Sequence, residues 1–139
     1  VQLTSIPVTE INQNIDFKNC PDLAQTVMVV AAIKGIELTM TGLESLKIKE
    51  TDRVMAMKKE LLKIGCLLNE ENGIWRLKSG TVPEHLKTIE TYEDHRMAMA
   101  FAPVCMVKAT TIRDIEVVKK SYPDFWAHLK SVGITFSEC

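Results

Sequence analysis

Residues 50–77 read ETDRVMAMKKELLKIGCLLNEENGIWRL, a stretch that predicts a helix followed by a β-hairpin. Apolar residues recur at helical spacing through its first half. They are Val54, Met57, Leu61 and Ile64. Charged residues, Glu60 among them, stand between these positions, so we expect an amphipathic helix over Glu50–Ile64. Gly65 follows directly and is typical of a helix end.

The second half of this stretch predicts the hairpin. Two short runs, Cys66–Asn69 and Ile74–Leu77, flank the segment Glu70–Gly73. Its Asn-Gly pair is the one that two-residue hairpin turns favour, because both residues tolerate a positive φ.

Helices and strands alternate along the rest of the chain. We expect helices over Leu23–Ile33, Asp94–Val107 and Pro123–Val132, strands over Val1–Thr4, Asn14–Phe17, Ile36–Thr41, Thr88–Thr91, Thr110–Val117 and Ile134–Phe136, and a loop or short strand over Leu43–Ile48. Pro103 predicts a kink or a break within its helix. The last helix is expected to have an apolar face made of Phe125, Trp126, Leu129 and Val132.

This alternation predicts the fold class α/β (α+β). The helix that Gly35 closes is apolar nearly all round, so we expect it to be buried on most sides. The second half of the chain loosely repeats the first, which indicates two related units. We place them at roughly residues 1–80 and 81–139, the second one incomplete.

Length and charge limit the function. The chain has 139 residues, 17 Lys and Arg, 18 Asp and Glu, and a net charge of −1. This balance excludes a nucleic-acid module driven by bulk positive charge, although it allows a small basic pocket. The longest apolar run, Met97–Val107, is too short to span a bilayer, so we expect no membrane partner.

The cysteines indicate a reduced, cytoplasmic protein. Cys20, Cys66, Cys105 and Cys139 are far apart and form no Cys-x-x-Cys pair, so we expect neither a zinc site nor a disulfide framework. No signal peptide is recognisable, and the sequence starts at Val1 without Met. We therefore expect it to be part of a longer chain.

Charged residues gather at the expected helix starts. Lys47–Arg53 leads into one helix, Tyr92–Arg96 into another, and Asp22 lies at the mouth of a third. Asp94 is a suitable N-cap, whereas Arg96 in a first turn opposes the helix dipole and suggests an anionic partner.

Two interpretations of these charges stay open. Each helix start is either an ordinary solvated surface with ion pairs, or one part of a shared anion pocket. In the second case the cations are Lys49, Arg53, Arg96 and Lys120, and the carboxylates are Asp22 and Glu50. Such a set suits phosphorylated carboxylate substrates and acid–base chemistry. The sequence has none of the GxGxxG, GxxxxGK[ST], GxSxG or HExxH motifs.

Three ordered runs resemble those of the 5-enolpyruvylshikimate-3-phosphate synthase family (3-phosphoshikimate 1-carboxyvinyltransferases). They are Lys49–Arg53, Thr91–Met99 and Lys120–Phe125. Asp22 also lies in a Pro-Asp-x-Ala-x-Thr stretch like the family's. The resemblance runs over essentially the whole chain but covers only the C-terminal part of the family's sequence. It implies the enolpyruvyl transferase fold, with about two of its repeated βαβαββ units present.

The resemblance also implies an activity. The family transfers the enolpyruvyl group of phosphoenolpyruvate to the 5-hydroxyl of shikimate 3-phosphate and releases phosphate, with no metal or organic cofactor. By this resemblance Asp22 accepts a proton from the shikimate hydroxyls, and Glu50 handles the methylene proton of phosphoenolpyruvate.

The same resemblance implies binding roles. Arg53 and Arg96 hold the carboxylate of phosphoenolpyruvate, and Lys120, or Lys119 if the loop is offset by one residue, lies near its phosphate. Lys49 contacts the shikimate phosphate, and Asp94 orients its neighbours. Two positions depart from the family pattern, Ser45 and Glu93, where Asn is frequent. Ser45 can still hydrogen-bond shikimate 3-phosphate.

The expected partners are therefore the two substrates and the N-terminal portion of the same enzyme, with no nucleic acid. We expect the chain alone to be inactive, because half of the donors of the pocket lie on segments that it lacks. Two alternatives stay open. One is the related UDP-N-acetylglucosamine enolpyruvyl transferase, and the other is a non-catalytic interaction module that associates with itself through exposed apolar surface.

Overall fold

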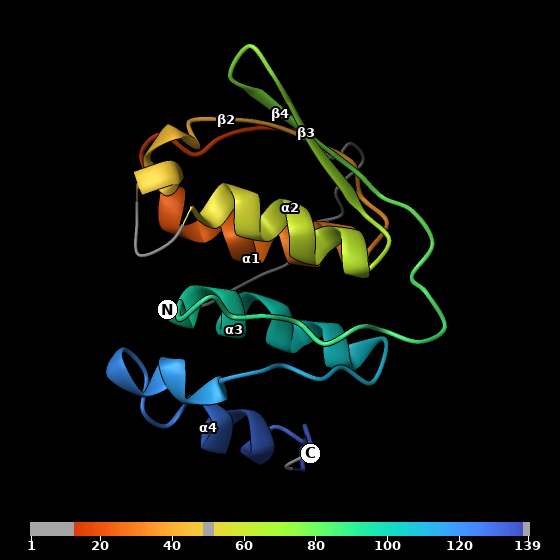
Figure 1. Cartoon of the computed structure of the whole chain (residues 1–139), viewed down its shortest axis with the longest axis vertical. Coiled ribbons are helices and arrows are strands. Elements are labelled where there is room, and N and C mark those ends of the chain that lie inside the picture. Colours follow the sequence, from red (N-terminus) through yellow and green to blue (C-terminus); the bar gives the residue numbers. More distant parts are fainter. Residues whose placement is uncertain (1–12, 49–51, 138–139) are drawn as a thin grey trace, which may run out of the picture.

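The computed structural model describes residues 13–48 and 52–137 and places their elements in successive layers (Figure 1). The strands are β1 (Asn14–Asp16), β2 (Leu38–Thr41), β3 (Leu67–Glu71) and β4 (Ile74–Lys78). The α-helices are α1 (Ala24–Ile33), α2 (Arg53–Lys63), α3 (His95–Phe101) and α4 (Phe125–Ser131). The 3₁₀ helices are η1 (Pro21–Leu23), η2 (Glu44–Ile48), η3 (Ala102–Met106) and η4 (Ile115–Lys120).

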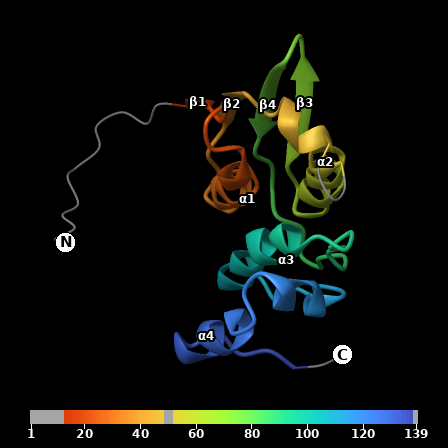
Figure 2. The same cartoon turned by 90° about the vertical axis from the view of Figure 1, so that its left-hand side faces the viewer.

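The strands of the described residues form one four-stranded sheet in the order β1-β2-β4-β3 (Figure 2). β1 and β2 are parallel and joined across α1, whereas β2–β4 and β4–β3 are antiparallel. Met40 of β2 pairs with Ile15 of β1 on one side and with Trp75 of β4 on the other. The order of elements over residues 14–78 is therefore βαβαββ.

α1 is the central helix, which explains why its sequence is apolar nearly all round. It contacts β4, α2 and α3, and α3 lies on the side of α1 away from the sheet (Figures 1 and 2). Met28 and Val29 are fully buried within it. A helix that touches neighbours on several sides has no room for a polar face, so the predicted burial is confirmed.

The hairpin has the turn that Asn-Gly predicts. Asn72 and Gly73 both have positive φ, 53° and 76°, as a two-residue hairpin turn requires. The paired strands run from Leu67↔Lys78 to Glu71↔Ile74. Both predicted strands form: β3 starts at Leu67, one residue later than predicted, and extends to Glu71, and β4 extends one residue further, to Lys78.

α2 starts at Arg53, with Asp52 as its N-cap accepting a hydrogen bond from the Met55 N–H at 3.0 Å. The predicted start at Glu50 lies outside the described residues. The expected amphipathic pattern is wrong at Glu60. This residue was placed among the polar, exposed positions of the helix, but it is fully buried.

The second half of the chain has less strand than the sequence predicts. Thr88–Thr91 and Thr110–Val117 meet only in a parallel bridge between Ile89 and Ile112. The second prediction is wrong from residue 115 on, where η4 begins and buries Val118. β-branched runs form strands when a neighbouring strand pairs with them, and packing of η4 on α3 takes its place here.

The outcomes of five other predictions differ from one another. Ile134–Phe136 is irregular rather than a strand, and residues 44–48 form η2. The helix predicted over Asp94–Val107 breaks at η3, as Pro103 indicates. α4 has no fully buried residue, and Val132 of its expected apolar face is 75% exposed. Val1–Thr4 lies outside the described residues.

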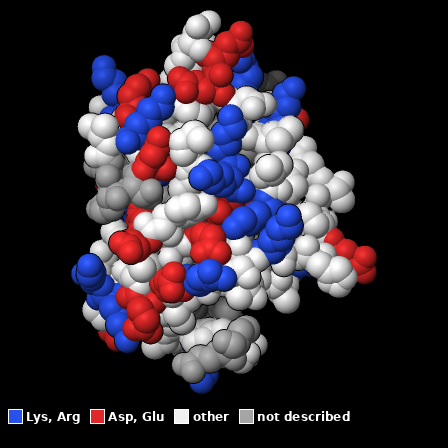
Figure 3. All heavy atoms as spheres, in the orientation of Figure 1, with Lys and Arg blue, Asp and Glu red and all other residues white. Residues whose placement is uncertain are grey.

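The surface carries acidic and basic side chains interspersed on the face seen in Figure 3. No helix in the described part of the chain is long and apolar enough to cross a bilayer. Cys20, Cys66 and Cys105 are free thiols, and Cys139 lies outside the described residues.

Candidate functional site

The starts of α1, α2 and α3 lie at the same side of the molecule (Figure 1). Arg53, the first residue of α2, contacts both Asp22 of η1 and Asp94, the N-cap of α3. Arg96 in the first turn of α3 also reaches Asp22. The structure thus brings together four of the predicted site residues in one ionic cluster, Asp22, Arg53, Asp94 and Arg96.

Arg53 and Asp94 form the buried part of this cluster. Arg53 Nε donates to Asp94 Oδ2 at 2.5 Å, and Nη2 donates to Oδ1 at 3.3 Å. The two side chains are 2% and 0% exposed. A buried charge is tolerated when it is paired and hydrogen-bonded, and this two-point contact meets both conditions.

Asp94 connects the buried pair to α3. Its Oδ1 accepts a hydrogen bond from the Arg96 N–H at 2.9 Å, so the predicted N-cap is confirmed. His95 Nδ1 lies 3.9 Å from the same oxygen. The carboxylate that holds Arg53 therefore also fixes the first turn of α3.

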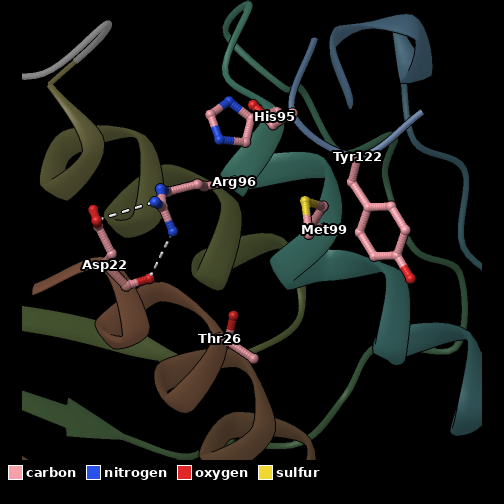
Figure 4. Close-up of a pocket in the computed structure, with 7 residues that line it drawn as sticks. Asp22, Thr26, His95, Arg96, Met99 and Tyr122 are labelled. Atoms are coloured by element: carbon pink, nitrogen blue, oxygen red, sulfur yellow. Dashed lines mark hydrogen bonds and ion pairs between the residues drawn. The ribbon is translucent and has the colours of Figure 1, made fainter. Parts of the chain in front are cut away.

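Asp22 and Arg96 form the accessible part of the cluster (Figure 4). Arg96 Nη2 lies 3.0 Å from Asp22 Oδ2, and Arg96 Nη1 donates to the Asp22 backbone carbonyl at 3.3 Å. Both side chains are partly exposed, 35% for Arg96 and 46% for Asp22. Asp22 is the anionic partner that a cation in the first turn of α3 needs. Arg53 Nη1 lies 3.4 Å from the other oxygen, Oδ1.

A pocket of about 220 Å³ opens beside this accessible pair (Figure 4). Its walls come from the start of α1, from α3 and from the turn after η4. The lining residues are Asp22, Thr26, His95, Arg96, Met99, Ser121 and Tyr122. A partly exposed guanidinium beside a small polar pocket can bind a carboxylate or phosphate group.

The other predicted residues do not line this pocket, and two of them lie outside the described residues. Lys120 is exposed and directly precedes Ser121 of the pocket, and Lys119 pairs with Glu116. Ser45 is half-buried in η2, which contacts η1. Lys49 and Glu50 lie outside the described residues.

Sequence reasoning missed Thr26 and Glu60. Thr26 follows Asp22 by four residues, the spacing that puts two side chains on one helix face.

Glu60 accepts hydrogen bonds from Tyr92 Oη at 2.7 Å and from the Glu90 N–H at 2.9 Å. Burial, and then the hydrogen bond to Glu60, raises the pKa of the Tyr92 phenol above its usual range, so it stays a donor. The sequence feature that could have indicated the burial of Glu60 is its position two helical turns after Arg53, which puts both side chains on the same face.

Metal-ligating residues do not gather elsewhere in the described ranges. Among residues 13–48 and 52–137, no group of three or more His, Cys, Asp and Glu side chains is placed to hold a metal ion.

The βαβαββ order, with paired arginines and aspartates where three helices start, defines an α/β protein with a candidate anion site at its helix starts. Two solved structures of EPSP synthase from Acinetobacter baumannii share its fold, with TM-scores of 0.69 and 0.66 at 24% and 21% identity. The matches cover 83% and 84% of this chain and 28% and 27% of the solved chains. The fold is that of the enolpyruvyl transferases.

The particular family follows from sequence comparison. The profile of EPSP synthase (3-phosphoshikimate 1-carboxyvinyltransferase) matches residues 3–129, so the chain belongs to this family. A 3-phosphoshikimate 1-carboxyvinyltransferase from Bacteroides fragilis is 46% identical over 125 residues, which cover 85% of this chain and 30% of that relative. One from Methanospirillum hungatei is 37% identical over 119 residues, covering 85% and 27%. The chain thus spans about 30% of the length of these relatives.

Proposed function

We propose that this chain is part of an enzyme that transfers the enolpyruvyl group of phosphoenolpyruvate to the 5-hydroxyl of shikimate 3-phosphate and releases phosphate. The observation that carries the proposal is the ionic cluster beside the pocket. Its members are the residues that match the family's motifs, and they meet although they come from three separate segments.

Arg96 and Arg53 are the proposed ligands of the phosphoenolpyruvate carboxylate. Arg96 is the more exposed of the two and lines the pocket, so we expect it to make the first contact. A planar guanidinium matches a carboxylate at two points. Asp22 then gives up its ion pair with Arg96 as the substrate carboxylate replaces it.

Asp22 and Glu50 are the proposed proton-transfer groups. The 5-hydroxyl oxygen attacks C2 of phosphoenolpyruvate while its proton passes to Asp22 and Glu50, in its protonated form, gives its proton to C3. A proton then returns from C3 to Glu50 as phosphate departs from C2 with the electrons of the C–O bond. Asp22 suits this role because it lies in the pocket wall and is accessible.

The remaining roles surround this centre. Lys120 precedes the pocket turn and is proposed to bind the phosphate of phosphoenolpyruvate, with Lys119 as the substitute. Lys49 and Ser45 are proposed to bind shikimate 3-phosphate. Asp94 orients Arg53 and the first turn of α3.

The longer protein is proposed to complete the site. Because the relatives are about three times as long as this chain, we expect the 139-residue chain to be inactive alone and to need the N-terminal portion of its enzyme. We also propose that residues 1–80 and 81–139 are successive repeat units. The parallel bridge between Ile89 and Ile112 spans α3 as the parallel pair β1–β2 spans α1. Free thiols at Cys20, Cys66 and Cys105 favour a reducing, cytoplasmic location.

Phosphate release by the full-length protein tests the proposal. With both substrates present we expect turnover that Glu50→Gln and Arg96→Ala each reduce by at least about a hundredfold. Arg76→Ala is the control, because Arg76 forms an exposed ion pair with Glu71 on the β3–β4 hairpin. Turnover with UDP-N-acetylglucosamine in place of shikimate 3-phosphate would assign the related transferase instead. No turnover with either acceptor would leave the chain as an interaction module.

A further inference from the structure

α2 carries a second buried charge on the face that bears Arg53. Glu60 follows Arg53 by seven residues, two helical turns, so the two side chains point to the same side of the helix. Both are buried, Arg53 at 2% and Glu60 at 0% exposure. Arg53 belongs to the ionic cluster described above, whereas the hydrogen bonds and the ion pair of Glu60 go to Lys63, Glu90 and Tyr92.

Glu60 instead binds the segment that leads to Asp94. Its Oε2 accepts from the Glu90 backbone N–H at 2.9 Å and from Lys63 Nζ at 2.6 Å, and its Oε1 accepts from Tyr92 Oη at 2.7 Å. Lys63 Nζ also donates to the Thr88 carbonyl at 2.7 Å. α2 therefore holds residues 88–94 at successive points, from Thr88 to Asp94.

This segment needs such support because its backbone is strained. Tyr92 and Glu93 have φ of 54° and 57°, two consecutive left-handed residues without glycine. Side chains other than glycine resist this conformation, and it persists only where the surroundings impose it. The regular pairing of the segment within the described chain is the single bridge at Ile89.

The strained turn sets the direction of the site residues that follow it. Asp94 comes next in the chain, accepts the Arg96 N–H and holds Arg53, and Arg96 reaches Asp22. We propose that Glu60 is a positioning residue: by binding the Glu90 N–H and the Tyr92 hydroxyl, it holds the left-handed turn that aims Asp94 and Arg96 at Asp22.

The kinetic consequence rests on the proposed function. Arg96 binds the substrate carboxylate in the ground state and in the transition state, so misdirecting it weakens binding more than it slows the chemistry. We expect Glu60→Gln to raise KM for phosphoenolpyruvate about tenfold, with a smaller change in kcat. Tenfold is the factor that the loss of one hydrogen bond to a charged group typically causes.

Amide hydrogen exchange on the full-length protein tests the positioning without using activity. Glu60→Gln keeps the shape of the side chain but removes its charge, and the amide nitrogen cannot accept a hydrogen bond as the carboxylate oxygen in its place does. We expect exchange at Glu90 and Arg96 to become about tenfold faster, while exchange in β4 stays unchanged. Glu70→Gln is the matched control, since Glu70 forms an exposed ion pair with Lys47.

Two results would overturn the inference. One is unchanged exchange at residues 90–96 in Glu60→Gln, and the other is equal acceleration throughout the protein, which signifies general destabilisation only. If Glu60→Gln does not fold, Tyr92→Phe removes one hydroxyl from the same contact. Its Arg96 amide must then exchange faster for the inference to hold.

A double-mutant comparison separates positioning from stability. If Glu60 acts through Arg96, Glu60→Gln changes KM for phosphoenolpyruvate in the wild type but produces no further change in Arg96→Ala. A lower melting temperature with unchanged KM contradicts this. If the wild type shows no turnover at all, the proposed function fails, whereas the exchange experiment still decides the role of Glu60.

Discussion

Arg53→Met measures what the buried ionic pair contributes to stability. Methionine keeps an unbranched stem but removes the guanidinium, so Asp94 loses its hydrogen bonds at 2.5 and 3.3 Å while it keeps the one from the Arg96 N–H at 2.9 Å. Asp94 is fully buried and would be left without its arginine. Breaking one side of such a pair costs about 3–5 kcal/mol. For a chain of this size that lowers the melting temperature by on the order of 10–20 °C.

Urea unfolding followed by tryptophan fluorescence is the assay, because Trp75 in β4 is only 5% exposed and reports loss of the core. Arg76→Met is the control. It breaks the exposed pair with Glu71 at 3.2 Å and should cost no more than about 1 kcal/mol.

A double mutant completes this test. Asn at position 94 still caps α3, so Arg53→Met combined with Asp94→Asn should be less destabilised than the sum of the two single changes. Additive effects, or a cost for Arg53→Met as small as that of Arg76→Met, would refute the reasoning that burial makes this pair important.

Two further predictions concern backbone packing and pH. Gly65→Ala should destabilise the chain by at least about 2 kcal/mol, because the new Cβ would lie 2.1 Å from the Thr81 carbonyl oxygen. Gly73→Ala, also at positive φ but with only Glu44 Oε1 near the new Cβ, at 3.9 Å, should cost only about 1 kcal/mol, and equal costs in urea unfolding would contradict the steric argument. The raised pKa of Tyr92 means that the unfolded chain releases this proton at lower pH than the folded one. The free energy of unfolding should therefore fall as the pH rises above about 10, and Tyr92→Phe should make this fall less steep in alkaline melts.

The sequence predicts best where a pattern is local. The hairpin follows from one Asn-Gly pair, and α3 starts at the capping Asp94 because capping involves only neighbouring residues. Pro103 likewise ends α3 through its own missing N–H. Each of these features is decided within a few residues of the chain.

The strand predictions for the second half of the chain are wrong for a non-local reason. Thr110–Val117 has the composition of a strand, yet a strand forms only where a partner offers hydrogen bonds. The described chain provides a single bridge at Ile112, and Val118 packs in the core instead. The sequence pattern of a segment does not tell whether a partner strand lies beside it in the fold.

The site was partly predictable. The gathering of Asp22, Arg53 and Arg96 was one of two interpretations of the charges at helix starts, and the structure brings them together. Asp94 was expected there only as an N-cap and from the family resemblance. Their pairings were not expected, because the choice of Asp94 rather than a ligand as the partner of Arg53 depends on tertiary distances. The burial of Glu60 was missed because a glutamate between apolar positions is usually solvated.

The ionic cluster also bears on how the chain folds. Its contacts join residues 31, 41 and 74 positions apart, whereas the β3–β4 hairpin closes over a short loop. Closing long loops costs entropy before any contact compensates for it, so such contacts form late. The β2–β4 pairs, from Leu38↔Leu77 to Met40↔Trp75, also join distant parts of the chain, so it is the Arg96–Asp22 contact, across 74 positions, that we expect to form after the sheet. The pocket beside this contact would then appear only once the sheet is in place.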